Sequence, residues 1–517
     1  MMFDVVVVGF GPVGAVAACL LGQAGLKTLV VERSTKVWDK PRAIAIDHEI
    51  LRLFQNIGVA EAVLPHTAPF TASEHFGVDG QLIRRVDMVP EPYPQGYVPS
   101  MVFTQPPVEA ALRAHAAAYP SVEVRLGTAF ASLDQSPDGV AVTLDDGEIV
   151  QAAYVIGADG ASSPVRKHLG IPFEDLVFDE PWMVIDVRVN PAGLAKLPRT
   201  SAQFCEPARP ATFIIGPGNH RRWEIMLLPG EDARDMEAPD RIWALLARWL
   251  DPADGELWRA NSYRFHALVA ARWRQGRVFL AGDAAHQQPP FIGQGMCQGI
   301  RDAANLAWKL DTVLRGEADD ALLDTYGVER GLHVRTLTAR IKAIGQAICE
   351  RDPAAAAARD ARLIAEGGGQ APTVTRQDIV PPLQAGLLAP ARPRTHPGVA
   401  DAARGTLFPQ PWLETPNGPA RMDAVVGTGW RLVIDGRTAP PASVTAGHTT
   451  VVIGPASAQL GGWQERDGVV AAWFDRHDCV AALLRPDNYV FGIAPTQNDV
   501  AALLHGARLR TRETIVA

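Results

Sequence analysis

This sequence has few cysteines, no long apolar run and no excess of positive charge. Its 517 residues include only 5 cysteines, and these lie too far apart to form a CxxC pair or a metal-binding spacing with histidine. Their scarcity excludes a disulfide framework and a zinc site, and it fits a reducing cytoplasm. No apolar run reaches the roughly 20 residues that span a bilayer, and the first residues have a strand pattern rather than that of a secretory leader. We therefore expect a cytoplasmic protein without a bound metal.

The balance of charge narrows the choice of partners. A formal net charge of −8 argues against nucleic acid or an anionic membrane as the main partner. Hydrophobic residues make up 47% and charged residues 21% of the chain, as in ordinary globular proteins. A chain of this length is too long for one hydrophobic core, so two or three domains are expected.

The N-terminal stretch FDVVVVGFGPVGAVAACLLGQAGLKTLVVERS has the pattern of a dinucleotide-binding unit. Val5 to Val8 is a β-branched run typical of a parallel strand buried on both faces. A GxGxxG turn follows, and a second strand ends at Glu32, about 20 residues on, where an acid can accept ribose hydroxyls. An acid there favours an unphosphorylated ribose, as in FAD or NAD. The residues expected to approach the cofactor phosphates are Gly9, Gly11, Pro12 and Gly14.

A second stretch, FLAGDAAHQQPPFIGQG, has the pattern of the ligand edge of an open α/β sheet. We expect a buried strand from Arg277 to Ala281 that delivers a Gly-Asp pair to the edge where ligands lie. Two later glycines would let backbone amides approach a flat ring, and a following helix directs its positive end toward that ring. The alternative is an ordinary strand-turn-helix with an incidental aspartate. The candidate cofactor-binding residues are Gly282, Asp283, Gly293, Gly295 and Met296.

A third stretch, AAYVIGADGASSPVRKHLG, has a strand, a turn at Asp159 and Gly160, and a helix start that carries Arg166. Together the three stretches resemble the fingerprints of the group A flavoprotein aromatic hydroxylases, the para-hydroxybenzoate hydroxylase-like superfamily, over roughly residues 1 to 390. The nearer likeness is to the 3-(3-hydroxyphenyl)propionate hydroxylase branch. It is carried by KPRAIAIDHEILRLFQNIGV, FTQPPVEAAL, CEPARP and PPFIGQGMCQGIRDAANLAWKL.

The resemblance implies non-covalently bound FAD, with NADH or NADPH and O2 as co-substrates and no separate domain for the nicotinamide. It places Arg33 and Arg42 by the FAD pyrophosphate and adenosine, and Gln105 by the ribityl chain. It places Asp283 on the ribityl chain and pyrophosphate, and Asp159 in a motif tied to both FAD and the nicotinamide cofactor. The sequence agrees, since it has no second GxGxxG with a strand and an acid.

The expected fold is α/β, with a Rossmann-like FAD-binding domain of the glutathione-reductase type interleaved with an antiparallel-sheet substrate domain. We assign residues 1–72, 101–178 and 266–390 to the FAD-binding domain, and residues 73–100 and 179–265 to the substrate sheet. Residues 395–517 resemble the thioredoxin-like C-terminal domain of the phenol hydroxylase relatives, with strands expected at RLVIDG, TTVVIGP, VVAAWF and YVFGIA. This part lacks CxxC, so packing or oligomerisation is its expected role, and a homodimer is left open.

The resemblance also implies the reaction. A reduced flavin that has reacted with O2 forms a C4a-hydroperoxide, which transfers oxygen to an aromatic ring activated by a phenol hydroxyl. Deprotonation of the phenol assists this transfer, so a base or polar relay is expected, and water must be kept out. Asp47 and His48 in IAIDHE are the candidates for the relay, although the nearer branch carries two acids here. Asp47 is equally suited to cap the following helix, and His48 to start that helix without a catalytic task.

Three further residues complete the candidate catalytic set. His286 in GDAAH is expected beside the flavin ring, either as structural support or in the chemistry. Pro290 is expected to offer a backbone group near the ring. Arg209 in CEPARP is the first candidate to bind a substrate carboxylate in a bidentate pair, and a solvated surface charge is the alternative. Its rivals for this role are Arg188, Arg221 and Arg222.

These inferences predict a single-component FAD-dependent monooxygenase that hydroxylates a small phenolic compound, such as a 3-hydroxyphenylpropionate-, resorcinol- or substituted-catechol-like molecule. Two alternatives share the fold: a hydroxylase of polyketides or other polycyclic aromatics, and a Baeyer–Villiger-type oxygenase. Two others belong to different classes: an FAD-dependent reductase without oxygen insertion, and a flavin-binding protein without turnover.

Overall fold

The computed structural model describes residues 2–390, 402–438, 448–454 and 462–512. The strands of its first sheet are β1 (Met2–Val8), β2 (Thr28–Glu32), β8 (Val122–Leu126), β11 (Ile149–Gly157), β17 (Arg274–Gln275) and β18 (Val278–Leu280). Their order is β17-β18-β11-β1-β2-β8, and all neighbours are parallel except β17 with β18. A hairpin of β9 (Phe130–Ser136) and β10 (Gly139–Leu144) extends β11. The predicted buried parallel strand at Val5 to Val8 is confirmed.

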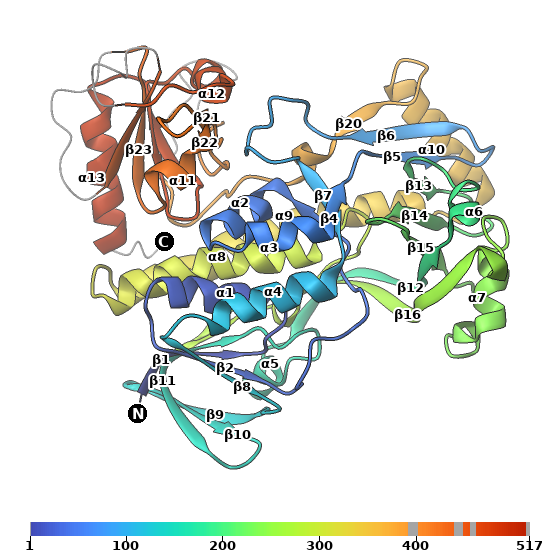
Figure 1. Ribbon diagram of the computed structural model, residues 1–517, viewed down its shortest axis with the longest axis horizontal. Coiled ribbons are helices and arrows are strands. Elements are labelled where there is room, and N and C mark those ends of the chain that lie inside the picture. Colours follow the sequence, from blue (N-terminus) through green and yellow to red (C-terminus); the bar gives the residue numbers. More distant parts are fainter. Residues whose placement is uncertain (1, 391–401, 439–447, 455–461, 513–517) are drawn as a thin grey trace.

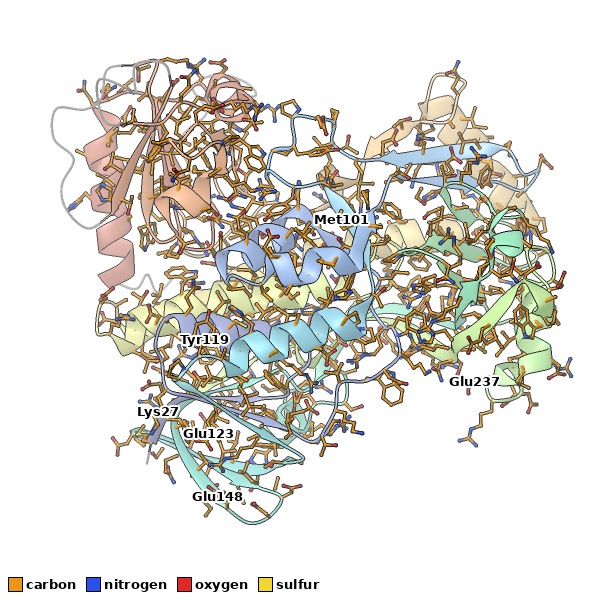
Figure 2. The ribbon with its side chains drawn as sticks, in the orientation of Figure 1. Lys27, Met101, Tyr119, Glu123, Glu148 and Glu237 are labelled. Carbon is orange, nitrogen blue, oxygen red and sulfur yellow. The ribbon has the colours of Figure 1, made fainter. Side chains whose placement is uncertain are left out.

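Three helices lie along one face of this sheet (Figure 1): α1 (Pro12–Gln23), α4 (Gln105–Ala117) and α8 (Gly295–Leu314). Glycines in α1 allow the close packing. A Cβ at Gly14 would lie 2.0 Å from the Gly9 carbonyl oxygen, and one at Gly22 would lie 2.7 Å from the ring of Tyr119, labelled in Figure 2. No helix among the described residues is both long and apolar enough to cross a membrane.

The second sheet has nine strands, which run across the right of Figure 1. They are β5 (Ala72–Phe76), β6 (Leu82–Asp87), β12 (Phe173–Val189), β13 (Ser201–Phe204), β14 (Ala211–Ile215), β15 (His220–Met226), β16 (Gly255–Ala270), β19 (His286–Gln287) and β20 (Thr373–Thr375). The order is β19-β16-β12-β15-β14-β13-β5-β6-β20, and neighbours are antiparallel except β5 with β13 and β6 with β20. Separate segments of the chain therefore have to come together to build this sheet.

Short elements join the two sheets. A three-stranded sheet pairs β3 (Ala45–Asp47) and β4 (Thr67–Pro69) with β7 (Ser100–Phe103). After β18, a 3₁₀ turn at Gly282–Ala284 leads straight into β19, so the Gly-Asp pair bridges the first sheet and the edge of the second. The remaining helices of this part are α2 (His48–Asn56), α3 (Ala60–Val63), α5 (Pro164–His168), α6 (Pro191–Leu194), α7 (Pro239–Leu246), α9 (Asp324–Ile348) and α10 (Pro353–Glu366).

The C-terminal part, at the upper left of Figure 1, has a sheet of its own. Strands β23 (Arg431–Asp435), β24 (Thr449–Ile453), β25 (Ala481–Leu484) and β26 (Val490–Ala494) take the order β24-β23-β25-β26. β23 is parallel to β24 and antiparallel to β25, and β25 is antiparallel to β26. A short pair, β21 (Trp412–Leu413) and β22 (Ala420–Arg421), and helices α11 (Met422–Val426), α12 (Val469–His477) and α13 (Asp499–Arg512) complete it.

One strand expected in this part is wrong. The stretch VVAAWF lies in helix α12 and contributes no strand. Periodicity alone does not separate a short apolar run of a buried strand from one of a helix. The strands expected at RLVIDG, TTVVIGP and YVFGIA are present as β23, β24 and β26.

Two buried ion-pair clusters fasten the C-terminal part to the rest of the chain. In the first, Arg52 of α2 donates to both carboxylate oxygens of Asp423 at 2.6 and 2.7 Å, and Arg431 donates to the same carboxylate at 2.7 Å. In the second, Glu329 of α9 accepts hydrogen bonds from Lys309 at 2.8 Å and Arg485 at 2.7 Å. The C-terminal part is thus anchored through interior charges as well as apolar contacts.

Candidate active site

The GxGxxG turn forms an open cradle at the N-terminus of α1. Gly9 has φ +100°, and a Cβ there would lie 2.4 Å from the Ala158 carbonyl oxygen, so the turn abuts the end of β11. At Gly11, by contrast, an added Cβ meets no described atom within 4 Å, which leaves free space in front of the helix. Pro12 occupies the first turn of α1, where no backbone N–H is needed. This free space beside exposed backbone fits a pyrophosphate at a helix N-terminus.

Glu32, the acid at the end of β2, hydrogen-bonds backbone on both sides of it in the fold. Glu32 accepts hydrogen bonds from the backbone N–H of Phe10 and of Ser34, each at 2.8 Å. It therefore links the glycine turn to the loop that follows β2. Its predicted contact with the ribose stays a prediction, as does the role of Arg33, whose side chain is exposed in that loop.

Gln105 shapes the segment that leads toward the cavity. Its side-chain oxygen accepts hydrogen bonds from the backbone N–H of Ala43 at 2.7 Å and of Arg42 at 3.2 Å. The Arg42 side chain remains half exposed, with Glu109 at 3.7 Å. Arg42 and Gln105, both assigned to FAD by the resemblance, are thus in direct contact.

The Asp-Gly turn after β11 has an unused acceptor. One carboxylate oxygen of Asp159 accepts a hydrogen bond from Val165 N–H at 2.9 Å, and the other is buried without a partner among the described residues. Burial raises the pKa of this carboxyl group. Gly160 has φ +83°, which allows the tight bend. Arg166 donates to the Ala284 carbonyl at 3.2 Å and so connects this turn to the Gly-Asp turn.

The Gly-Asp turn lies at the same edge of the first sheet. Gly282 has φ +62°, and a Cβ there would lie 2.9 Å from Val13 of α1. Asp283, which follows, is exposed, and its predicted contact with the cofactor stays a prediction. His286 is fully buried: it hydrogen-bonds Asp302 at 2.8 Å and stacks on Trp273 at 5.4 Å between ring centroids. Of its two expected roles, these contacts favour structural support.

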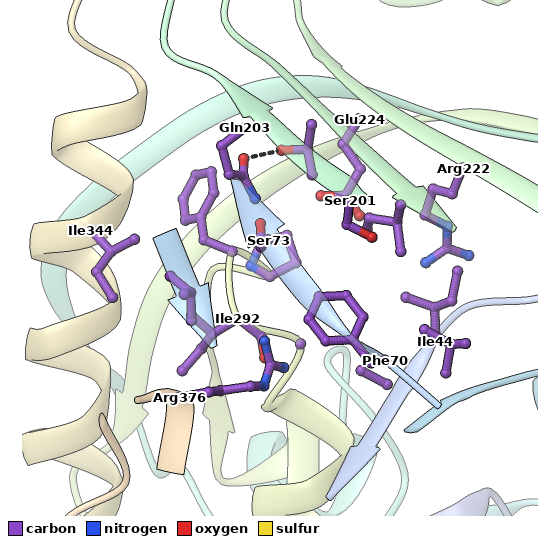
Figure 3. A pocket seen from close by; sticks show the side chains of 18 of the residues that line it. Ile44, Phe70, Ser73, Ser201, Gln203, Arg222, Glu224, Ile292, Ile344 and Arg376 are labelled. Atoms are coloured by element: carbon purple, nitrogen blue, oxygen red, sulfur yellow. Dashed lines mark hydrogen bonds between the residues drawn. The ribbon is translucent and has the colours of Figure 1, made fainter. Parts of the chain in front are cut away.

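A cavity of about 200 Å³ lies against the second sheet (Figure 3). One wall comes from residues 42–45 and from the loop that carries Pro290, Gly293, Gly295 and Met296. Gly293 has φ +61°, and a Cβ on it would lie 2.9 Å from Ala45, so only glycine lets this loop approach β3. Phe70, Phe291 and Ile344 make much of the remaining surface apolar. The four loop residues predicted from the sequence are therefore brought together at the cavity.

The opposite wall carries a row of polar side chains, one from each of five adjacent strands. The strand registers pair Arg84 with His75, His75 with Gln203, Gln203 with Thr212, and Thr212 with Glu224. All five line the cavity, and we call them the polar row. Gln203 and Thr212 are joined by a 2.6 Å hydrogen bond, drawn in Figure 3. The row has a cation at one end and an acid at the other.

The acid of the polar row is buried and unpaired. Glu224 is 4% exposed, and its carboxylate makes no hydrogen bond or ion pair among the described residues. Burial raises the pKa of Glu224 to about 7, against the opposing effect of Arg222. Arg222 itself is occupied, since it donates to both oxygens of Asp186 at 2.7 and 3.1 Å and to the Arg42 carbonyl at 2.7 Å.

The expected relay at Asp47 and His48 lies behind the cavity wall, because neither side chain lines the cavity. Asp47 caps α2 by accepting from Ile50 N–H at 3.2 Å, and it pairs with Arg301 at 2.6 Å. Burial by itself would raise the pKa of Asp47, but the Arg301 guanidinium outweighs it and lowers that pKa. Burial lowers the pKa of His48 to about 4, so this imidazole is neutral at pH 7. These contacts favour the two alternatives: Asp47 caps α2, and His48 is the first residue of that helix.

Arg209 also lies outside the cavity. It is paired in bidentate fashion with Glu231 at 2.6 and 2.9 Å and donates to the Met226 carbonyl. Of its rivals, Arg222 lines the cavity but is held by Asp186, whereas Arg188 stacks on Trp258 and Arg221 binds nearby carbonyls. Among the titratable residues that line the cavity, the sequence analysis missed His75, Arg84, Glu224 and Arg376. Alternation along each strand could indicate which face they share, but only the strand pairing shows that they meet.

A glycine cradle together with a cavity of this kind is typical of α/β enzymes that bind a dinucleotide beside a small-molecule site. A family model described as "FAD binding domain" matches residues 2–341, and one described as "HcaD C-terminal domain" matches residues 405–507. A "Probable NADH-specific resorcinol 4-hydroxylase" of Rhodococcus jostii (strain RHA1) is 38% identical over 97% of this chain and 93% of its own. A "3-(3-hydroxy-phenyl)propionate/3-hydroxycinnamic acid hydroxylase" of Mycobacterium sp. (strain KMS) is 35% identical over 97% and 91%.

Among solved structures, the flavin-dependent monooxygenase PieE in complex with FAD and substrate superposes with a TM-score of 0.81. It is 23% identical and the match covers 99% of both chains, so it shows that the fold is shared over the whole length. This chain belongs to the FAD-binding-domain family of flavoprotein aromatic hydroxylases, and the resemblance found in the sequence is confirmed. FAD is therefore the cofactor of this chain.

Proposed function

We propose that this protein is a single-component FAD-dependent monooxygenase that hydroxylates a small phenol, with NADH or NADPH as the reductant and O2 as the oxidant. The observation that carries the proposal is the cavity of about 200 Å³ between the loop at Gly293 and Gly295 and the polar row. The two relatives described above are named for resorcinol and for 3-(3-hydroxyphenyl)propionate, and each matches nearly the whole chain. Both compounds carry one aromatic ring.

The size of the cavity favours a single-ring substrate. Pockets for drug-sized ligands enclose about 300–1,000 Å³, more than the 200 Å³ found here. This difference weighs against a polyketide or another polycyclic substrate. The apolar wall of Phe70, Phe291 and Ile344 also shields the site from water, which oxygen insertion requires and a simple flavin reductase does not.

Bound FAD supplies the redox chemistry and the activation of O2. The protein contributes the placement of the two ligands. The cradle at Gly11 receives the phosphates, Asp159 and Asp283 offer carboxylate oxygens to the cofactor, and the loop at Gly293 and Gly295 presents backbone to its ring. Pro290 lines the cavity beside this loop and fits the role of a backbone contact.

For the C-terminal part we propose a thioredoxin-like domain with a packing role. The strand order β24-β23-β25-β26, with one parallel and two antiparallel pairs, supports this assignment. Its only cysteine, Cys479, is buried, and burial raises its thiol pKa to about 12, which disfavours a redox task. We also propose a cytoplasmic location, because all five cysteines are unpaired. The domain boundaries given above, and a homodimer, remain proposals.

The test is to purify the protein with its FAD and to follow NADH and NADPH oxidation with resorcinol, 3-(3-hydroxyphenyl)propionate and substituted catechols. Hydrogen peroxide is measured in parallel. We expect phenol-stimulated oxidation with little peroxide, and a hydroxylated product that carries one atom of ¹⁸O from ¹⁸O2. Stimulation with stoichiometric peroxide would mean that the phenol fits the site but is not the substrate. If no phenol stimulates oxidation, the proposal is wrong and the reductase alternative gains support.

A further inference from the structure

We infer, on the basis of the proposed function, that the substrate is a phenol with an acidic side chain that lies along the polar row. Its hydroxyl gives a proton to the Glu224 carboxylate, and its acidic group binds the Arg84 guanidinium. The inference rests on two unpaired groups of opposite charge at the two ends of one row of cavity-lining side chains.

Glu224 is placed to touch a ligand and not to support the fold. It is 4% exposed, lines the cavity and has no partner among the described residues. Figure 3 shows it beside Ser201 and Arg222 on the wall that faces Ile292 of the cofactor-side loop. A buried acid without a hydrogen bond is costly to a protein, and a ligand hydroxyl would supply the missing partner.

Arg84 has the matching position at the other end. It lines the cavity, its Nε is buried without a hydrogen bond, and none of the ion pairs among the described residues includes it. Glu366 acts on its charge only from beyond ion-pair distance. Each of the other three arginines at the cavity has a partner: Arg42 pairs with Glu109 at 3.7 Å, and Arg222 pairs with Asp186. Arg376 donates to the Ile292 carbonyl and lies over the face of Phe70. Arg84 therefore has the free guanidinium that a carboxylate would pair with.

Arg84 and Glu224, at the two ends of the polar row, lie too far apart to form an ion pair with one another. Adjacent strands lie about 4.8 Å apart, so four steps separate Arg84 from Glu224 by about 19 Å of sheet. The space between is lined by His75, Gln203 and Thr212, which carry no charge partner for either end. Burial lowers the pKa of His75 to about 3, with a further contribution from Arg84, so its ring is neutral at pH 7. An elongated ligand with a hydroxyl at one end and an anion at the other satisfies both.

The proton transfer at Glu224 balances without any further reagent. The phenol O–H bond breaks, its electron pair stays on the phenol oxygen, and the proton binds a Glu224 carboxylate oxygen. The charges that face this carboxylate are Arg222 on its own strand, Asp186 on β12 and Arg259 on β16. Asp186 is already paired with Arg222 and His220. A pKa of about 7 for Glu224 lets it take up a proton near neutral pH.

The first experiment measures the pH dependence of kcat/KM for 3-(3-hydroxyphenyl)propionate in the FAD-loaded wild type and in Glu224→Gln. Below its pKa the acid is protonated and cannot accept the phenol proton, so wild-type activity should rise with pH through about 7. In Glu224→Gln we expect a loss on the order of 100-fold at neutral pH. The rising limb should move toward about pH 10, where a phenol ionises unaided.

Two further variants separate chemistry from structure. Glu224→Asp keeps a carboxylate and should retain a limb near neutral pH, and exposed Glu256→Gln on the same sheet should match wild type. FAD content and Tm are compared for all of them. If Glu224→Gln and Glu224→Asp both keep the wild-type kcat and pH profile, Glu224 is not the proton acceptor. A flat profile in wild type would overturn the assignment as well.

The second experiment tests the acidic end with 3-(3-hydroxyphenyl)propionate and its uncharged primary amide. Wild type should prefer the acid, and Arg84→Met should raise KM for the acid by about 10- to 100-fold with little effect on the amide. The inference is overturned if wild type treats acid and amide alike, or if Arg376→Met alone abolishes the preference. A wild type that turns over resorcinol but shows neither effect would leave the proposed function intact, whereas inactivity with every phenol would remove that function itself.

Discussion

Gly11 and Gly14 of the GxGxxG turn differ in what surrounds them. The Cβ of any other residue at position 14 would lie 2.0 Å from a backbone carbonyl oxygen, which cannot move without shifting β1. At position 11, an added Cβ would meet no described atom within 4 Å. We therefore expect Gly14 to be required for folding, and Gly11 for the approach of a ligand to the backbone.

This contrast gives a prediction at the residue scale. Gly11→Ala should fold with a wild-type Tm in the absence of FAD but should bind FAD ~10-fold more weakly or worse, because the methyl group fills the space of a phosphate. Gly14→Ala should instead unfold at a lower temperature even without FAD. Apo-protein Tm and an FAD titration by flavin fluorescence measure the two effects. Equal FAD affinity in Gly11→Ala and wild type would contradict the assignment.

At the scale of elements, Arg166 connects the turn that carries Asp159 to the turn that carries Asp283. It starts from α5, donates to Ala284 in the turn after β18, and stacks over Phe173 at 3.7 Å. Arg166→Met should release the two turns from one another, weaken FAD binding by about 10-fold and change Tm by only a few degrees. Exposed Lys167→Met on the same helix is the matched control. A variant that binds FAD as wild type does would show that packing alone aligns the turns.

The elements near these turns were predictable from the sequence because their signals are local. A glycine pattern, a β-branched strand before it and an acid after it lie within one continuous stretch, and β1, α1 and β2 follow that stretch closely. The polar row is not local, because it depends on the register of five strands from two separate parts of the chain. For the same reason the sequence analysis named Asp47 as a candidate acid and did not consider Glu224. Asp47 precedes a recognisable helix, whereas Glu224 looks like any charge on an alternating strand.

At the scale of the whole molecule, the C-terminal part is held by charges with no access to water. Arg52 and Arg431 are 1% and 0% exposed, and both depend on Asp423. Removal of one member of a buried cluster leaves the others unpaired, which costs about 3–5 kcal/mol. Surface pairs such as Arg437 with Asp475 contribute about 0–1 kcal/mol. The attachment of the C-terminal part therefore depends on few residues.

This arrangement predicts how the protein responds to acid. Burial would raise the pKa of Asp423, but Arg52 and Arg431 outweigh it and hold that pKa well below its usual range; Lys309 and Arg485 do the same for Glu329. A folded-state pKa below the unfolded value of about 3.9–4.3 gives stability that is present above that pH and is lost as the pH falls further. The free energy of unfolding should thus decline below about pH 4.

Asp423→Asn should be less stable than wild type at pH 7, by about 3–5 kcal/mol, and should show a shallower decline in acid. Chemical denaturation of the full chain at several pH values measures both effects, with Asp475→Asn as the surface control. If Asp423→Asn and wild type lose stability in parallel below pH 4, Asp423 does not carry the acid response and the attachment must depend on the apolar contacts.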